Sequence, residues 1–389
     1  MNESTATLPL GGTRIIDLTH ALSGPFATFH LALMGAEVIK IEPPGTGDEF
    51  RDFRPTIFAQ ANAGKRSVTL DLKQAAGSEA LHRLIAGADV VIENFRPGVA
   101  LELGLDWETL KIAFPQLIYC SVSGYGQSGE LRDRPAIEWS VQAMSGVSSL
   151  YVDDHAEPRT LGLTILDPFA GYVAYSAIMA ALLQRHKTNR GQRLDVGMFD
   201  AAWVLNSSAV VDVMAGLVPV PMAKRANSAR FMAKDRRLFI SFVWPKWFKT
   251  LCDVLEAPEL LIDPRFADNS SMQANGEALI EEIERRLAGR TAEEWARELT
   301  QRGVPASAIC TIAEAADWPQ VRERKLLEIA EFQQGGERVE VVGSGVVFEH
   351  DSPRLQGPVP ALGEFTEQAL LQAGYDRQQI EGLRRDGVI

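Results

Sequence analysis

The first third of the chain alternates short apolar runs with segments of helical periodicity, and this alternation constrains the fold more than any other feature. Runs of strand length and composition occupy residues 14–18, 37–41, 67–72, 90–93 and 117–121. Between the first two runs, residues 25–34 have helical periodicity, with Pro25 at their start and Gly35 as a left-handed stop after them. Strands that alternate with helices pack as a parallel sheet covered by helices. The sequence therefore predicts an α/β fold with a Rossmann-like, doubly wound large domain.

The pattern changes after a predicted helix at residues 201–214, where Pro219 and Pro221 interrupt the chain. The next stretch combines a strand-like run at 238–243 with helical segments at 247–255, 277–287 and 292–301. Thr291 and Glu294 have the spacing of a capping box at the start of the last of these helices. Further on, a strand-like pattern at 339–348 is followed by helical segments at 364–373 and 378–386. We therefore predict a smaller α+β domain over residues 220–325.

The size and charge of the chain exclude several functions. At 389 residues the chain is long for a single core, which agrees with two domains. A net charge of -12 and a pI near 5.1 argue against binding to nucleic acid, which needs a basic surface. We find no apolar run of membrane-spanning length and no signal-peptide pattern in residues 1–5. We therefore expect a cytoplasmic protein with no nucleic-acid or membrane partner.

The sequence carries no motif for a metal or a dinucleotide. The six histidines have no ligand-like spacing with one another or with cysteine, so we predict no metal site. No Gly-x-Gly-x-x-Gly follows the first strand-like run, which removes the main support for NAD or FAD binding. His20 differs from the other histidines because it follows the first strand, and open α/β sheets bind ligands at strand ends.

Asp167 precedes a proline at the start of a long helix that is rich in small residues. An aspartate at such a position is typical of an N-cap, because its carboxylate accepts a hydrogen bond from a free amide of the first turn. The positive end of the helix dipole also keeps a carboxylate ionised there, so that it can act as a nucleophile. The residues around Asp167 favour the cap, although one carboxylate can serve in both roles.

Several short motifs run through the chain in a fixed order. They occupy residues 14–20, 23–25, 33–42, 64–73, 93–98, 121–129, 162–171, 190–196, 362–364 and 387–389. This ordered set resembles the class III CoA-transferase family, which includes formyl-CoA transferase and carnitine-pathway CoA-transferases. The resemblance implies that residues 1–205 and 340–389 build the large CoA-binding domain together and that residues 220–325 form the small domain. It also implies that two ring-shaped subunits interlock as a homodimer.

The resemblance further implies an activity and a set of site residues. The protein is expected to move CoA from an acyl-CoA to a small carboxylic acid, with CoA as a substrate and no permanently bound cofactor. Asp167 is the expected nucleophile, through an aspartyl anhydride and an aspartyl thioester. Glu138 matches an acidic position near the site, where it either orients substrate or nucleophile or is a surface helix glutamate. The residues expected to bind CoA are His20, Ala21, Leu70, Lys73, Asn94, Phe95 and Arg96.

Some positions depart from formyl-CoA transferase. Leu22 replaces a glutamine that contacts the acyl group, and Pro43 and Glu102 replace arginines that bind CoA. Residues 242–245 replace a mobile glycine-rich loop. We therefore expect a larger, more apolar acyl group or a dicarboxylic acid rather than formyl or oxalyl transfer. The alternative interpretation is an α-methylacyl-CoA racemase, whose branch has a histidine where this chain has Ile137, and α-proton transfer needs such a second acid or base.

Overall fold

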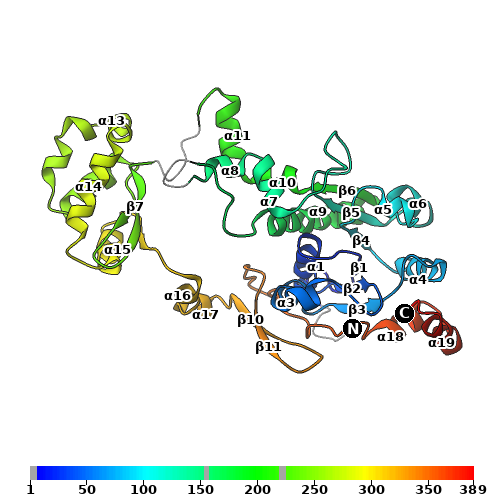
Figure 1. Ribbon diagram of the computed structural model, residues 1–389. Coiled ribbons are helices and arrows are strands. Elements are labelled where there is room, and N and C mark those ends of the chain that lie inside the picture. Colours follow the sequence, from blue (N-terminus) through cyan, green and yellow to red (C-terminus); the bar gives the residue numbers. More distant parts are fainter. Residues whose placement is uncertain (1–6, 153–156, 219–224) are drawn as a thin grey trace. The chain divides into compact units, whose positions relative to one another are not determined.

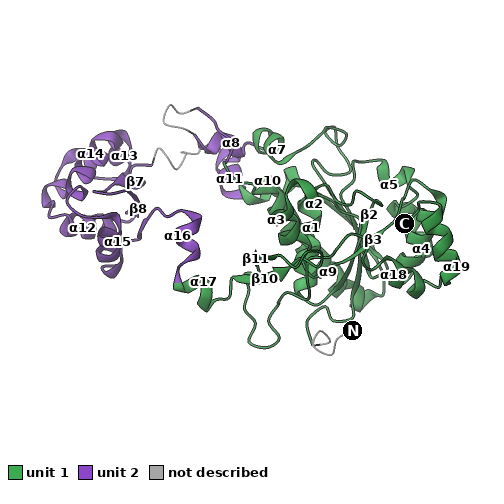
Figure 2. Cartoon of the chain, turned by 60° about the horizontal axis from the view of Figure 1, so that its bottom comes forward, with its two compact units in different colours: residues 1–145, 162–206, 319–389 green, residues 146–161, 207–318 purple. Residues whose placement is uncertain are grey.

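The computed structural model describes residues 7–152, 157–218 and 225–389 of the chain. Two compact units are distinguished in Figure 2, and each is described by itself. Unit 1 consists of Met1–Ser145, Gly162–Asn206 and Pro319–Ile389, and unit 2 consists of Gly146–Leu161 and Ser207–Trp318. Residues 1–5 and the predicted start of the small domain at residue 220, with Pro219 and Pro221, lie outside the described residues.

Unit 1 contains a six-stranded sheet in which all neighbouring strands are parallel (Figure 1). The strands are β1 Arg14–Asp17, β2 Glu37–Glu42, β3 Arg66–Thr69, β4 Val90–Glu93, β5 Ile118–Ser123 and β6 Gln192–Gly197. Their order, β3-β2-β1-β4-β5-β6, is that of a doubly wound Rossmann sheet, with a topological switch point between β1 and β4. The α/β fold predicted for the large domain is therefore confirmed.

Strand β6 has no counterpart among the strands predicted from the sequence. It lies at the edge of the sheet and pairs with β5 alone, and its residues Arg193 and Asp195 are exposed. The other strands, including the edge strand β3, are mostly buried and form short apolar runs, whereas the first four residues of β6 alternate between half-buried and exposed. A search for apolar runs finds those strands and misses β6.

Helices cover both faces of the sheet, because successive residues of a strand point to opposite faces. Ile15 of β1 packs in one core with α1 Ser23–Leu33 and α9 Leu166–Thr188. Ile16, the next residue, packs in the opposite core with α4 Ala75–Ile85. The other elements of unit 1 are α2 Phe50–Phe53, α3 Pro55–Asn62, α5 Val99–Glu102, α6 Trp107–Ala113, α7 Glu138–Met144, α10 Met198–Leu205, α17 Pro319–Glu323, β10 Leu327–Glu331, β11 Arg338–Val342, α18 Thr366–Gln372 and α19 Arg377–Arg385.

The C-terminal part of the chain belongs to unit 1. Leu370 of α18 and Ile380 of α19 are buried in the same core as α4. The hydroxyl of Thr366 accepts a hydrogen bond of 2.9 Å from the amide of Thr69, at the end of β3. This part begins at Pro319, earlier than the predicted residue 340, because the β10–β11 hairpin packs with α3 in a core of unit 1.

Helix α9 has 23 residues and is apolar enough, by length and composition alone, to cross a membrane. Among the residues that the structure describes it is the one helix that passes this test, with a mean hydropathy of 1.4. The sequence-based expectation that no apolar run reaches this length was therefore wrong. In the structure one side of α9, with Ala174, Ile178 and Ala181 buried, packs against α1, β5 and β6, and 33% of its apolar window is buried.

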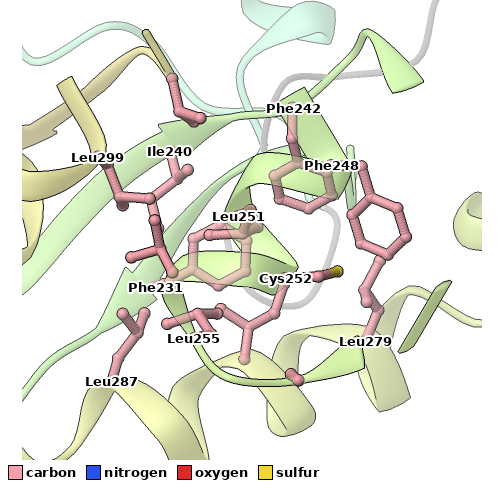
Figure 3. Close-up of a cluster of buried hydrophobic side chains, with 14 of the residues drawn as sticks. Phe231, Ile240, Phe242, Phe248, Leu251, Cys252, Leu255, Leu279, Leu287 and Leu299 are labelled. Carbon is pink, nitrogen blue, oxygen red and sulfur yellow. The ribbon is translucent and has the colours of Figure 1, made fainter. Parts of the chain in front are cut away.

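Unit 2 contains an antiparallel sheet of β7 Ser228–Met232, β8 Arg237–Ser241 and β9 Ala306–Ala308. Its remaining elements are α8 Val147–Leu150, α11 Ser207–Met214, α12 Pro245–Val254, η3 Pro258–Leu261, η4 Pro264–Phe266, α13 Asn269–Ala274, α14 Gly276–Leu287, α15 Ala292–Gln301 and α16 Ile312–Ala316. Phe231, Phe242, Phe248 and Leu251 form part of its core (Figure 3). The capping box of Thr291 and Glu294 is formed.

Three sequence-based boundaries need correction. The helix predicted at 201–214 is interrupted at Asn206, whose side chain donates to the carbonyl oxygen of Ala202 at 2.9 Å, and the boundary between the units falls there. Residues 146–161, predicted in the large domain, make contacts that group them with unit 2. The strand predicted at 339–348 ends at Val342, because its antiparallel partner β10 begins opposite that residue, at Leu327.

Candidate active site

Two loops meet at the switch point of the sheet. Asn94, after β4, donates through Nδ2 to the carbonyl oxygen of His20, after β1, at 2.8 Å. Its Oδ1 accepts from the amide of His20 at 2.9 Å. Ala21 follows with a φ of 61°, in the left-handed region that alanine rarely adopts. Three of the predicted CoA-binding positions thus shape the crevice in which open α/β sheets bind ligands.

A pocket of about 540 Å³ lies at the carboxyl ends of β1, β2, β3 and β4. Of the residues predicted to bind CoA, it is lined by His20, Leu70, Lys73 and Phe95. Its apolar lining also includes Leu18, Ile41, Pro43, Leu72, Val99 and Leu103. Ala21, Asn94 and Arg96 are not among its lining residues, and the side chain of Arg96 is exposed. An apolar pocket with a few polar groups is typical of a site for a small organic ligand.

The charged side chains of this pocket are mostly acidic. Asp48, Glu49, Asp71 and Glu102 line it. Among its described lining residues, Lys73 is the exposed cation, since Lys40 is fully buried. The pocket therefore places one accessible ammonium group where a phosphate could pair with it. Within residues 7–152, 157–218 and 225–389, no group of three or more His, Cys, Asp or Glu side chains is placed to hold a metal ion.

A network of buried charges lies beneath the loops that line the pocket. Lys65 donates to Oδ2 of Asp17 at 2.9 Å and to the carbonyl oxygen of Pro25 at 3.0 Å. Lys40 donates to the carbonyl oxygen of Thr19 at 2.7 Å and lies 2.9 Å from Asp48. Burial alone would raise the pKa of Asp17, but Lys65 and Lys40 hold it well below its usual value. These pairs fix the loop between β1 and α1.

The buried charges of this network were not predicted from the sequence. Asp17 and Lys40 lie within or at the end of apolar strand-like runs, and both are completely buried. A charged residue inside an apolar strand is rarely buried without a partner. That pattern was a usable signal for a buried ion pair, although it does not say which residues pair.

Asp167 lies at the second residue of α9 and is half-buried. Its Oδ1 accepts a hydrogen bond from the hydroxyl of Ser23, the first residue of α1. Burial raises the pKa of Asp167 to about 6, the Ser23 hydroxyl lowers it, and the nearby charge of Glu138 raises it. The N-cap residue of α9 is Ile165, whose apolar side chain makes no capping hydrogen bond. The interpretation of Asp167 as the N-cap was therefore wrong.

Glu138 performs the capping from another helix. Its Oε1 accepts from the amides of Ile165 and Leu166 at 3.2 and 3.0 Å, and its Oε2 accepts from the amide of Asp167 at 2.7 Å. Gln142 donates to Oε1 at 2.6 Å. Glu138 is 5% exposed, so it is not a surface helix glutamate. The carboxylate of Glu138 thus accepts hydrogen bonds from three amides at the start of α9 that have no partner within the helix. These bonds fix the start of α9 and the position of Asp167.

Unit 1 is therefore an α/β fold with a ligand pocket at the switch point of a parallel sheet and a half-buried aspartate at the start of α9. The sequence profile of CoA-transferase family III matches residues 10–366. An acetyl-CoA:oxalate CoA-transferase of Acetobacter aceti is 37% identical, with 94% of this chain and 96% of that protein covered. A succinyl-CoA:glutarate CoA-transferase of Mus musculus is 32% identical, with 98% and 90% covered.

Solved structures agree with these sequence relatives. A CAIB/BAIF family protein from Brucella suis matches with a TM-score of 0.83 and 33% identity, over 94% of this chain and 99% of that one. A protein from M. tuberculosis matches with a TM-score of 0.85 and 32% identity, over 93% and 98%. The chain belongs to CoA-transferase family III. It is a CoA-transferase that acts between an acyl-CoA and a carboxylic acid, and these relatives give the racemase alternative no support.

Proposed function

We propose that the protein moves CoA from a short acyl-CoA to a dicarboxylic acid, with Asp167 as the nucleophile. The position of Asp167 carries this proposal. Its carboxylate is held by Ser23, its amide is held by Glu138, and no described lysine or arginine neutralises it. With a pKa near 6 it is mostly ionised at neutral pH, yet poorly solvated, which suits a nucleophile.

The reaction proceeds in steps that need no metal and no redox partner. One oxygen of Asp167 bonds to the acyl carbon, and the carbon–sulfur bond breaks with its electron pair on the CoA thiolate. The thiolate then bonds to Cγ of Asp167, and the donor acid leaves with the oxygen that had attacked. The acceptor acid reverses both steps and departs as the new acyl-CoA. A thiolate is a good enough leaving group to depart without a general acid.

The pocket at the carboxyl ends of β1 to β4 is the proposed CoA site. Lys73 and Phe95 line it, and we propose that Lys73 pairs with a phosphate and that the ring of Phe95 contacts the adenine or the pantetheine chain. The acidic residues Glu49, Asp71 and Glu102 around it leave few cations for the phosphates, so we propose that apolar burial supplies much of the CoA affinity.

The acceptor is proposed from the relatives and from the sequence. The relatives named above act on oxalate and glutarate, both dicarboxylic acids. Leu22 and Ile137 flank the residues that hold Asp167, and both are apolar. We therefore propose a dicarboxylic acid longer than oxalate, whose methylene groups contact these side chains.

We propose that the protein works as a homodimer in the cytoplasm, with no nucleic-acid or membrane partner. The dimer is supported by exposed apolar side chains on two neighbouring helices of unit 1. Tyr172 and Leu183 of α9 are 40% and 61% exposed, and Trp203 and Val204 of α10 are 43% and 61% exposed. We propose that a second subunit covers these side chains, since large exposed apolar side chains are enriched where subunits meet. Light scattering of the purified protein tests this proposal, because a homodimer has twice the 42.6 kDa mass of one chain.

A substrate screen combined with chemical trapping tests the activity. Acetyl-CoA and succinyl-CoA are each incubated with acetate, oxalate, succinate or glutarate, and new acyl-CoA is read by mass spectrometry. We expect transfer to glutarate or succinate, and hydroxylamine should convert Asp167 to a hydroxamate only when acyl-CoA is present. A hydroxamate at another residue, or none during turnover, contradicts the aspartyl route.

A deuterium experiment separates transfer from isomerase chemistry. The enzyme is incubated in deuterated water with a 2-methylacyl-CoA and an acceptor acid. A transferase that acts at the carbonyl carbon leaves the α-proton in place, whereas a racemase must exchange it. Rapid deuterium uptake without an acceptor, together with no CoA exchange in the acid screen, would support the isomerase instead.

A further inference from the structure

Ser23 contacts the carboxylate of Asp167, and the chemical steps proposed above do not yet involve its hydroxyl. Its hydroxyl donates to Oδ1 of Asp167, and Ser23 is 6% exposed. Among the residues that the structure describes, no side chain or amide donates to Oδ2 of Asp167. The two oxygens of the carboxylate are therefore in different surroundings, one held by a donor and one free to react.

Close packing brings these two residues together. Gly171 lies one helical turn after Asp167 on the same face of α9, where an added Cβ would lie 2.4 Å from the carbonyl oxygen of Ser23. At Gly24, an added Cβ would lie 2.3 Å from the side chain of Thr19. Lys65 holds the carbonyl oxygen of Pro25 at 3.0 Å. These contacts fix the position of the start of α1. The hydroxyl of Ser23 reaches Asp167 because residue 171 is a glycine and has no side chain between them.

We propose that Ser23 is a positioning residue that directs both chemical steps at Asp167. It holds one oxygen of the carboxylate, so that the other attacks the thioester of the acyl-CoA. The held oxygen then becomes the carbonyl oxygen of the aspartyl anhydride. This inference rests on the proposed function of Asp167 as the nucleophile.

The hydrogen bond from Ser23 to Asp167 becomes stronger in the second step, in which the aspartyl thioester forms. When the CoA thiolate bonds to Cγ of Asp167, negative charge develops on the oxygen held by Ser23, and the bond from Cγ to the attacking oxygen breaks as the donor acid leaves. A hydroxyl aimed at that oxygen stabilises the tetrahedral intermediate, as donors of an oxyanion hole do. The thiolate can also attack the acyl carbon and return to the starting acyl-CoA. Ser23 therefore favours the forward path to the aspartyl thioester.

The variant Ser23→Ala tests this role with two readouts. We expect the transfer rate to fall by about 10- to 100-fold, because one oxyanion donor is lost. The acid limb of the pH profile should move to higher pH, because the hydroxyl that lowers the pKa of Asp167 is gone. A residue that only supported the fold would not move this limb.

The mass added to Asp167 is the sharper readout. Each protein is mixed with succinyl-CoA or acetyl-CoA without an acceptor, quenched in acid and digested. We expect the wild-type peptide to carry CoA as the thioester and the Ser23→Ala peptide to carry the acyl group as the anhydride. Equal thioester formation in both proteins, with the acid limb unmoved, overturns the proposal. No adduct on Asp167 in either protein contradicts the proposed function itself.

Matched variants separate the hydroxyl from packing. Ser23→Thr keeps a donor and should restore the acid limb and the thioester. Ser176→Ala removes an exposed hydroxyl of α9, which donates to the carbonyl oxygen of Val173 at 2.8 Å, and should change neither readout. If Ser23→Ala does not fold, Ser23→Cys keeps the size of the side chain, replaces the hydroxyl by a weak thiol donor and is measured in the same way. A Ser23→Thr protein that behaves like Ser23→Ala would contradict the role of the hydroxyl.

Discussion

Asp17 and Asp167 are two aspartates of unit 1 in opposite electrostatic surroundings. Asp17 ends β1, is completely buried, and bonds to Lys65 and to the hydroxyl of Thr28. Asp167 begins α9, is half-buried, and has one hydroxyl donor and no cation. Burial acts to raise the pKa of both. Lys65 and Lys40 reverse that effect for Asp17, whereas Asp167 keeps a pKa raised to about 6.

This difference accounts for the structural role of Asp17 and supports the proposed role of Asp167 as the nucleophile. A carboxylate with cations and several donors is stabilised in its charged form and gains nothing from bonding to carbon. A carboxylate that lacks them remains basic and nucleophilic. Of the predictions below, two change a partner of one of these residues and one removes Asp167 itself. The other two concern the lysine of the proposed CoA pocket and the pH dependence of the unchanged enzyme.

Removing the carboxylate of the proposed nucleophile should have the largest effect. We expect Asp167→Ala to lower transfer by about 10⁴-fold or more, because the proposed covalent intermediate forms on that carboxylate. Asp167→Asn should be nearly as inactive. The rate is measured with the pair found in the screen, and the thermal unfolding midpoint shows whether the fold is intact. An alanine variant that keeps a substantial part of the activity contradicts the assignment.

Breaking the buried pair should reduce stability rather than chemistry. Lys65→Met leaves Asp17 buried without its nearest cation, which should cost about 3–5 kcal/mol of unfolding free energy. Urea denaturation measures this loss, and Arg83→Met, which removes an exposed partner of Glu79, is the control. A loss no larger than that of the control would show that Asp17 does not depend on its cation.

Neutralising the carboxylate that caps α9 should affect both position and pKa. In Glu138→Gln the amide nitrogen cannot accept from the backbone, so we expect a fall in kcat of about 10- to 100-fold from misplacement of Asp167. The charge that raises the pKa of Asp167 is also lost, so the acid limb should move to lower pH. Glu108→Gln, on the exposed face of α6, is the control. An unmoved limb would mean that the charge of Glu138 does not reach Asp167.

Lys73→Ala should weaken CoA binding modestly. An exposed ion pair contributes up to about 1 kcal/mol, so we expect KM for acyl-CoA to rise by about twofold to fivefold with kcat unchanged. The rise should shrink at high salt, because salt screens exposed charges. Lys111→Ala on α6 is the control, since that exposed lysine pairs with Glu108 away from the pocket. A fall in kcat alone would place Lys73 in a different role.

The smallest effect concerns the pH dependence of the wild-type enzyme. Asp167 must be ionised to attack, and its pKa is raised to about 6, so kcat/KM should rise with pH and be about half of its plateau near pH 6. An ordinary aspartate would reach its plateau near pH 5. A limb near pH 4 would remove the contrast between Asp167 and a well-solvated carboxylate.

The inner sheet was predictable because its strands are buried on both faces. The runs at 14–18 and 90–93 coincide closely with β1 and β4, and Gly35 has the predicted left-handed conformation, with a φ of 96°. β6 was not predictable from apolar runs, because its residues Arg193 and Asp195 are polar and exposed, unlike those of the other edge strand, β3. The split of α10 and α11 was also missed, because Asn206 interrupts a helical pattern that continues on both sides.

The candidate site was only partly predictable. His20, Leu70, Lys73 and Phe95 follow strands, and strand ends of a parallel sheet meet at one edge, so their common pocket agrees with the prediction. The roles assigned to them remain predictions. Ser23 could not be selected, because nothing in its neighbourhood in the sequence points to a residue 144 positions further on.

The sequence by itself determined the order of strands and helices, the family, and the residue types available at the strand ends. Local patterns carry this information, because apolar spacing and turn residues act over a few positions. Only the tertiary structure decided that Glu138 caps α9 and that Lys65 neutralises Asp17 while no described cation reaches Asp167. The reactivity of a carboxylate depends on burial and on charges within a few ångströms, and these partners come from distant parts of the chain.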